Sequence, residues 1–138
     1  MQPQHLFRLP TAILGARRKK ALSQKALALE AGIDGPRLSA LEHGRSVGPG
    51  GELVERLADA LSMSEIQKRE LRQAAAHDRV MREIVKNVDE DSCLLLALSL
   101  DAARLLTPMD RAALTTFIQQ LVGPREKLAY ALEGDAMS

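Results

Sequence analysis

Residues 22–45 read LSQKALALEAGIDGPRLSALEHGR, and their apolar positions repeat with the spacing of two short helices joined by a tight turn. Gly32 can adopt the left-handed conformation that ends the first helix. Ser23 and Asp34 are suitable N-caps, and Pro36 fits the first turn of the second helix because that turn needs no internal N–H bond. The apolar positions are Leu22, Leu27, Ala28, Ala31, Ile33, Leu38 and Leu41. The stretch therefore predicts two packed helices, with one face of the second left free.

Two helices joined by a short turn that contains glycine form a helix-turn-helix, whose second helix can enter the major groove of DNA. The stretch also resembles the Cro/phage-repressor (XRE) family, with the pattern L-S-Q-x-x-L-A-x-x-A-G-[VI]-x-x-x-x-[IL]-S-x-[IL]-E-x-G-[KR]. Every specified position is filled, by Leu22, Ser23, Gln24, Leu27, Ala28, Ala31, Gly32, Ile33, Leu38, Ser39, Leu41, Glu42, Gly44 and Arg45. The resemblance implies an N-terminal DNA-binding domain over about half of the chain.

Composition favours an all-α fold in a reducing compartment. The 138 residues are 46% hydrophobic but only 2% aromatic, and Ala and Leu, both good helix formers, dominate. Cys93 is the only cysteine, so no internal disulfide is possible. Asp101 and Arg104 interrupt the longest apolar stretch, and the N-terminus has no secretory signal. We therefore expect a cytoplasmic protein with no membrane span.

The net charge of +1 is unevenly distributed along the chain. Residues 1–50 carry eight Lys and Arg against three Asp and Glu, a net of +5, whereas residues 51–138 carry eleven against fifteen, a net of −4. A basic first part and an acidic second part indicate an anion-binding surface followed by a segment with another role. Chance imbalance between two halves is the alternative.

Periodicity and capping signals predict a helix-turn-helix domain over residues 1–77. Residues 1–9 are expected to form a loose arm, in which His5, Phe7 and Leu9 can still pack against the body. Ser64 and Gln67 form a capping box for the fifth helix. The glycine-rich loop over residues 46–51 is expected to be exposed or mobile. The five expected helices lie near residues 11–21, 24–31, 35–43, 52–61 and 65–77.

Residues 78–138 are predicted to form a second helical unit, so the expected fold is an all-α, five-helix repressor-like domain followed by a helical C-terminal bundle. Asp91 and Thr107 are the expected caps of two of its helices. Residues 92–106 are apolar almost all round, which is typical of a helix buried on most sides. The expected helices start near Asp78, cover residues 92–106 and 107–123, and end with a short one through Leu128, Ala129 and Leu132.

Candidate DNA contacts fall into phosphate-binding and base-reading groups. The resemblance implies phosphate contacts for Gln24, at a helix N-terminus, and for Arg45; Lys25 is adjacent, and His43 either donates to a phosphate or remains solvated. The base-reading positions that the resemblance implies are Gly35, Pro36, Arg37 and Ala40, with Ser39 close by. Only Arg37 can make a bidentate contact to guanine. The helix is therefore expected to recognise few bases directly, centred on one guanine in each half-site. The alternative is that it no longer recognises DNA at all.

Arg17 opens a basic run that extends through Lys20 at the end of the first helix. The run is either a DNA-facing surface or a solvated face with favourable charge at a helix C-terminus. For Arg17 itself the resemblance implies a structural ion pair with Glu42 rather than a DNA contact.

No constellation for catalysis is visible in the sequence. His5, His43 and His77 lack metal-ligand spacing, and Asp89-Glu90-Asp91 lacks the pattern of a calcium loop. Cys93 opens an apolar helix and is expected to be a buried inert thiol, with a thiol sensor as the alternative. We expect no enzyme activity, no metal and no cofactor.

The second unit is predicted to form a homodimer, because a two-fold interface would cover the spare apolar faces of its helices. A monomeric bundle is the alternative, and scarce aromatic residues disfavour a ligand pocket. The expected dimerisation residues are Leu94, Leu95, Leu98, Leu105, Phe117, Ile118 and Leu121.

These observations favour a cytoplasmic transcriptional regulator that binds double-stranded DNA as a dimer. Repression by occluding a promoter is the simplest mechanism, although activation uses the same contacts. The alternative is a protein-interaction module, such as an anti-activator or an antitoxin, whose helix-turn-helix surface binds a protein partner. The regulating signal or effector is left open.

Overall fold

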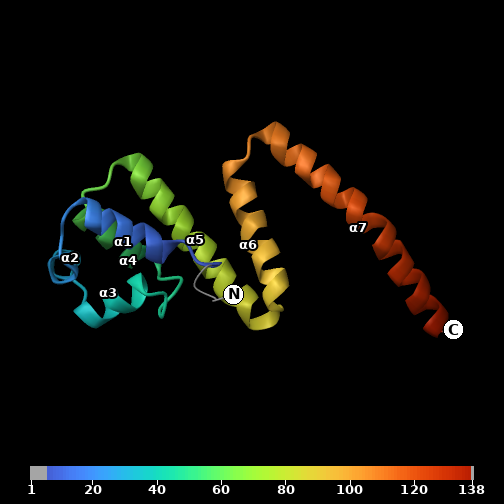
Figure 1. Ribbon diagram of the computed structural model, residues 1–138, viewed down its shortest axis with the longest axis horizontal. Coiled ribbons are helices and arrows are strands. Elements are labelled where there is room, and N and C mark those ends of the chain that lie inside the picture. Colours follow the sequence, from blue (N-terminus) through green and yellow to red (C-terminus); the bar gives the residue numbers. More distant parts are fainter. Residues whose placement is uncertain (1–5, 138) are drawn as a thin grey trace. The chain divides into compact units, whose positions relative to one another are not determined.

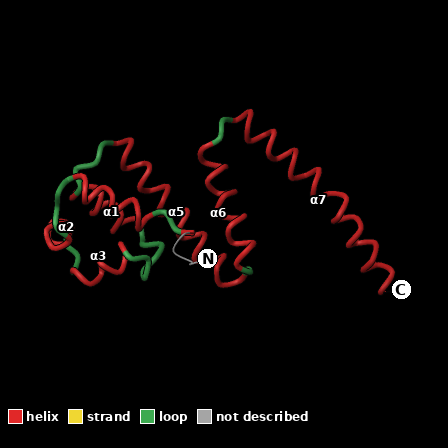
Figure 2. Tube along the Cα trace, in the orientation of Figure 1, coloured by secondary structure: helices red, strands yellow, loops and turns green. Residues whose placement is uncertain are grey.

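The computed structural model describes the backbone of residues 6–137 and the side chains of residues 6–125. Within these residues every regular element is an α-helix, as the sequence predicted (Figures 1 and 2). None of the described helices is long and apolar enough to cross a membrane. The helices are α1 (Leu9–Lys19), α2 (Gln24–Ala31), α3 (Gly35–Glu42), α4 (Gly51–Ala60), α5 (Glu65–Asn87), α6 (Glu90–Leu105) and α7 (Pro108–Met137).

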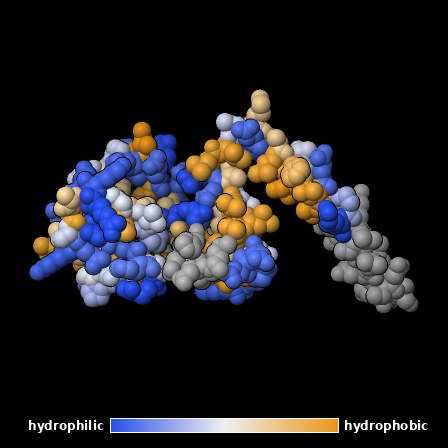
Figure 3. Space-filling model, in the orientation of Figure 1, coloured by the Kyte–Doolittle hydropathy of each residue, from blue (hydrophilic) through white to orange (hydrophobic). Residues whose placement is uncertain are grey.

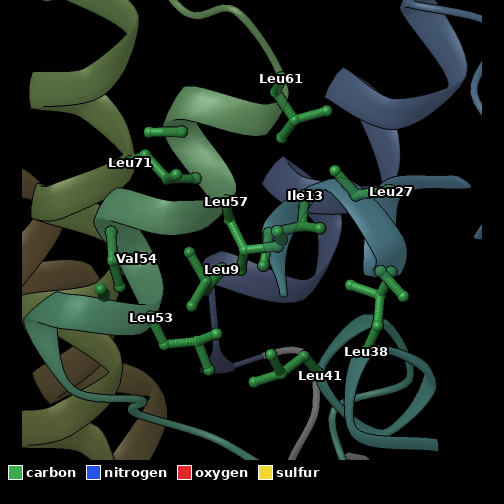
Figure 4. Close-up of a cluster of buried hydrophobic side chains, with 14 residues drawn as sticks. Leu9, Ile13, Leu27, Leu38, Leu41, Leu53, Val54, Leu57, Leu61 and Leu71 are labelled. Carbon is green, nitrogen blue, oxygen red and sulfur yellow. The ribbon is translucent and has the colours of Figure 1, made fainter. Parts of the chain in front are cut away.

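The first five helices enclose one apolar core (Figure 4). Helix α1 packs against α3 and α5, α2 packs against α3 and α4, and α4 packs against α5. Because burying a large apolar side chain contributes about 1.5–3 kcal/mol, this core fixes the positions of α2 and α3. Its largest members are Leu9, Ile13, Leu27, Leu38, Leu41, Leu53, Val54, Leu57, Leu61 and Leu71.

The N-terminal segment is packed rather than loose over its described part. Leu6 and Phe7 are buried, while His5 lies outside the described residues. Helix α1 begins at Leu9, earlier than predicted, because a carboxylate from α5 caps it: Asp78 accepts hydrogen bonds from the backbone N–H groups of Arg8 (2.7 Å) and Leu9 (2.9 Å). The cap satisfies two N–H groups that a helix start leaves without partners.

Helix α5 runs without a break through the position where one helix was predicted to end and another to begin. It starts at the predicted capping box, in which Ser64 Oγ accepts from Gln67 N and Gln67 Oε1 accepts from Ser64 N. The expected break near Asp78 is wrong, because that carboxylate caps α1 and not a new helix. No Gly or Pro interrupts residues 65–87. The predicted boundary between residues 77 and 78 therefore lies inside α5.

Helix α6 begins at a different cap and is less buried than predicted. Asp89, not Asp91, accepts from Ser92 N (3.1 Å) and Ser92 Oγ (2.7 Å), and these bonds lower the pKa of the Asp89 carboxyl. Of the α6 side chains only Cys93 and Ala97 are buried, so the expectation of a helix buried on most sides is wrong for a single chain. Figure 3 shows hydrophobic residues gathered on α6 and on the first half of α7.

Helix α7 starts at the predicted cap but continues past the predicted end. Thr107 Oγ1 accepts from Asp110 N at 3.2 Å. Pro124 lies inside the helix, so neither the stop there nor a separate last helix is found. Gly123 has no Cβ, which removes one of the clashes that make a residue before proline avoid helical geometry. The side chains of Leu128, Ala129 and Leu132 lie outside the described residues.

The chain divides into two units, residues 1–97 and 98–138. The second unit holds the end of α6 and all of α7, so its described residues form no closed helical bundle of the kind that the sequence predicted. None of the side chains of residues 98–125 is buried. This unit has no apolar core of its own over that range.

Candidate nucleic-acid interface

Helices α2 and α3 are joined by a three-residue turn built from local capping bonds. Ser23 Oγ accepts from Ala26 N at 3.0 Å and caps α2. Gly32 ends α2 in the left-handed conformation, with φ +70°, which an L side chain adopts only with strain. Asp34 Oδ1 then accepts from Arg37 N at 2.7 Å and caps α3. The predicted helix-turn-helix is therefore present.

One face of α3 enters the core and the other faces solvent. Leu38, Leu41 and Glu42 are buried on the inner face. Pro36 and Arg37 are exposed, and Arg37 alone of the base-reading candidates carries a long polar side chain. The remaining candidates are half-buried: Gly35, Ser39 and Ala40.

The N-termini of α2 and α3 differ in their affinity for an anion. Helix α2 has a neutral cap, Ser23, and no acidic residue in its first turn, and the side chain of Lys25 is exposed beside it. Helix α3 is capped by the carboxylate of Asp34. Since the helix dipole favours negative charge at an N-terminus, a phosphate is favoured at α2, whereas the Asp34 carboxylate already holds the N-terminus of α3.

The carboxylate of Glu42 joins three helices at the base of this surface. Arg17 of α1 donates to it from Nε (2.5 Å) and Nη2 (3.3 Å), so the structural pair that the resemblance implied is present. Gln24 of α2 donates from Nε2 at 2.8 Å, a bond that the sequence did not indicate. The Gln24 amide still has a second N–H, with which it can donate to a phosphate.

The C-terminal end of α3 carries the other phosphate candidates. His43 Nδ1 lies 2.8 Å from the carbonyl oxygen of Ser39, and Arg45 Nη2 donates to Ser39 Oγ at 3.3 Å. The backbone N–H groups of Arg45 and Ser46 both donate to the carbonyl of Ala40, at 2.9 and 3.1 Å. The exposed side chains of His43 and Arg45 are thereby held at the end of the helix.

The glycine-rich loop after α3 is anchored, although the sequence predicted an exposed or mobile segment. Gly48 is buried, with φ +64°, and a Cβ on it would meet the Arg79 backbone at 3.1 Å. Arg79 Nη1 donates to the carbonyl of Pro49 at 3.1 Å, and Arg82 Nη1 lies 3.4 Å from the carbonyls of Val47 and Gly48. Ser46, Gly50 and Gly51 are exposed, as predicted. The prediction was wrong for the middle of the loop, where Gly48 permits close approach to α5.

The residues considered for other chemistry lie apart. Cys93 is buried, with Sγ 3.5 Å from the carbonyl oxygen of Val88, and His77 Nε2 lies 2.9 Å from the carbonyl of Leu6. Among the described residues no three His, Cys, Asp or Glu side chains form a group that could hold a metal ion.

The family comparison agrees with this geometry. Residues 14–67 match the family model described as helix-turn-helix. The match begins in α1 and ends in the first turn of α5, so it includes α2, α3 and most of the core. No curated protein and no solved structure gives a significant match to the chain.

Proposed function

Residues 14–67 form a DNA-binding regulatory domain of the Cro/phage-repressor (XRE) helix-turn-helix type, and from this premise we propose that the protein is a sequence-specific regulator of transcription that binds duplex DNA as a dimer. Repression by occupying a promoter is the simplest mechanism, because it requires no contact other than the one with DNA. The observation that carries the proposal is the exposed face of α3, which presents Arg37, together with the neutral N-terminus of α2, where Lys25 is exposed.

The proposed DNA contacts divide by role. Gln24 and Lys25, at the start of α2, and His43 and Arg45, at the end of α3, would bind phosphates and fix the register of the domain on the duplex. Arg37 would read a guanine through its O6 and N7 acceptors, a contact that discriminates between bases by about 1–3 kcal/mol. Pro36 and Ala40 would contact thymine methyl groups. Gly35 and Ser39 complete the surface of α3 that faces the duplex.

Dimerisation is proposed for the helices that follow the DNA-binding domain. Large apolar side chains there are 37–82% exposed, more than a water-soluble monomer ordinarily leaves uncovered. A second copy of the chain would cover them and place two recognition helices on half-sites about 34 Å apart. The proposed interface residues are Leu94, Leu95, Leu98, Leu105, Phe117, Ile118 and Leu121.

Selection of binding sites from random duplex DNA, followed by salt titration on the selected site, tests the proposal. We expect a two-fold-symmetric site with one guanine in each half-site. The Arg37→Ala variant should tolerate any base at that guanine and lose about 1–3 kcal/mol of discrimination, while Arg69→Ala, an exposed cation of α5, should behave as the wild type.

Absence of binding to any duplex at low salt would overturn the transcription-factor proposal. It would favour the alternative of a protein-interaction module, in which the α3 surface binds a protein. A double variant, Gln24→Ala with Arg37→Ala, separates the two functions, because a DNA reader needs both side chains.

A further inference from the structure

Two arginines of α5 hold the loop that follows α3. Arg79 donates to the carbonyl of Pro49, and Arg82 approaches the carbonyls of Val47 and Gly48. Neither arginine belongs to the segment that matches the family model, which ends at residue 67. They reach the loop because α5 continues as one helix from Glu65 to Asn87.

The loop connects this pair of arginines to the C-terminal end of α3. It leaves α3 through the bonds of Arg45 N and Ser46 N to the carbonyl of Ala40 and reaches the arginines within three residues. Figure 1 shows the loop between α3 and α4 beside the C-terminal half of α5. The exposed side chain of Arg45 and the two α5 arginines therefore lie at the two ends of one short, anchored segment.

The guanidinium groups of Arg79 and Arg82 have N–H donors that the loop does not use, and their positive charge is not fully neutralised. A guanidinium has five N–H donors, and the bonds of Arg79 and Arg82 to the loop use only one nitrogen of each group. Within the described part of the chain no carboxylate forms an ion pair with Arg79. Arg82 is 42% exposed and lies 3.6 Å from Glu83, which Lys86 also approaches at 3.5 Å. Arg82 and Lys86 thus share the single carboxylate of Glu83.

We propose that Arg79 and Arg82 extend the DNA-binding surface onto α5 and bind backbone phosphates beyond those contacted by α2 and α3. The inference rests on the proposed function, because it names further contacts to the same duplex. Bonds to the loop carbonyls hold each guanidinium in place before DNA arrives, which lowers the ordering cost of a phosphate contact. Asp89, which follows the end of α5, carries a carboxylate that would repel a phosphate.

Substitution of each arginine by glutamine tests the inference on the full-length protein. Glutamine keeps a polar N–H donor, on a shorter side chain, and removes the charge. The dissociation constant is measured over a series of salt concentrations for the selected duplex and for an unrelated duplex. We expect Arg79→Gln and Arg82→Gln each to reduce the slope of log K against log salt by about 0.9, and to weaken binding to both duplexes by the same factor.

Arg69→Gln is the matched control, since it removes the same charge from the same helix about 15 Å before Arg79. It should leave the slope unchanged. An unchanged slope in both test variants, or a loss confined to the selected duplex, overturns the inference and leaves the proposed function intact. Failure of the wild type to bind either duplex is instead a failure of the proposed function.

Arg82→Gln keeps the test valid if loss of Arg79 prevents folding. Its bonds to the loop are long, at 3.4 Å, and its side chain is partly in solvent, so thermal unfolding of this variant should match that of the wild type. A reduced slope with an unchanged unfolding temperature supports a phosphate contact. If Arg82→Gln has the wild-type slope of log K against log salt and the wild-type unfolding temperature, Arg82 makes no phosphate contact.

Discussion

Glu42 is a charged side chain that is only 2% exposed, at the point where α1, α2 and α3 meet. Burial of a carboxylate costs several kcal/mol unless charged or polar groups compensate for the lost water. Arg17 and Gln24 provide that compensation, and a further bond from Arg17 Nη1 to the carbonyl of Leu22 fixes the guanidinium. The ion pair therefore sets the positions of α1, α2 and α3 relative to one another at the proposed DNA surface.

Replacement of Arg17 by methionine should destabilise the protein by about 3–5 kcal/mol, because it leaves the Glu42 carboxylate buried without its cation. Urea unfolding followed by circular dichroism measures the loss. The double variant Arg17→Met with Glu42→Met should recover part of it, since no charge then remains buried. Equal losses in the single and double variants would show that the pair does not act as a unit.

Asp78 is buried, and desolvation raises the pKa of its carboxyl above the ordinary value of 3.8, against the opposing effect of the Arg8 and Leu9 N–H groups. Because the folded chain then binds the proton more tightly than the unfolded chain, the free energy of unfolding falls as pH rises through the raised pKa. Asp78→Asn removes this dependence. It also leaves one N–H without an acceptor, at a cost of about 1–3 kcal/mol.

The measurement is urea unfolding of the wild type and Asp78→Asn from pH 4 to pH 7. The stability advantage of the wild type should be largest at the acidic end and should shrink as the Asp78 carboxyl ionises. An advantage that grows with pH would contradict the raised pKa, because it would mean that folding favours the ionised group.

Residues close together in the motif were easier to predict than residues brought together from distant segments. The pattern of residues 22–45, together with Arg17, predicted the turn at Gly32, the two caps and the pair with Glu42. The hydrogen bond from Arg79 to the carbonyl of Pro49 could not be predicted, because an arginine that binds a backbone carbonyl has no characteristic sequence pattern. Asp78 was wrongly predicted to start a new helix for a related reason, since the two N–H groups that it caps lie 69 and 70 residues away in the sequence.

At the scale of the helices, two predicted capping signals began a helix as expected, whereas two predicted stops were wrong. Ser64 and Thr107 begin α5 and α7 as predicted. The stop expected before Asp78 is absent because that carboxylate caps α1, and the stop expected at Pro124 is absent because Gly123, which has no Cβ, tolerates helical geometry before a proline. Residues 65–87 contain no glycine at which the chain could turn.

A proline in place of Val80 tests the continuity of α5. In the interior of a helix proline removes a hydrogen bond and clashes with the preceding turn, at a cost of about 3 kcal/mol or more. In the first turn of a helix that starts near Asp78 the same proline would be tolerated. We expect the larger loss in urea unfolding, compared with Val80→Ala as the control, because Val80 is 47% exposed and contributes little packing. A loss near zero would place a helix break at Asp78.

At the scale of the whole molecule, the two units differ in how far they bury their apolar side chains. Residues 1–97 contain the core, whereas residues 98–125 have no buried side chain. Composition and periodicity could predict helices there, but a helix stripe has the same pattern whether its partner is another part of the chain or a second chain. This is why the sequence left a monomeric bundle and a dimer as alternatives.

Acidic substitutions on the apolar surface test the proposed dimer. Leu98 and Phe117 are 54% and 55% exposed, so aspartate at either position should be harmless to a monomer and should disrupt a two-fold apolar interface. Sedimentation equilibrium should show a dimer for the wild type and a monomer for the Leu98→Asp, Phe117→Asp double variant. Ile66→Asp, which changes an apolar residue of α5 that is 70% exposed, is the control and should remain dimeric.

Loss of the dimer should also weaken binding to a two-half-site duplex by a factor of about 10²–10⁴, because the second half-site is then no longer bound intramolecularly. Binding to a single half-site should stay at the wild-type level, since Arg37 and the start of α2 are unchanged. A double variant that sediments as a dimer would place the interface elsewhere. A wild type that sediments as a monomer and still binds the symmetric site tightly would remove the need for dimerisation, and the apolar residues of α6 and α7 would then require a different partner.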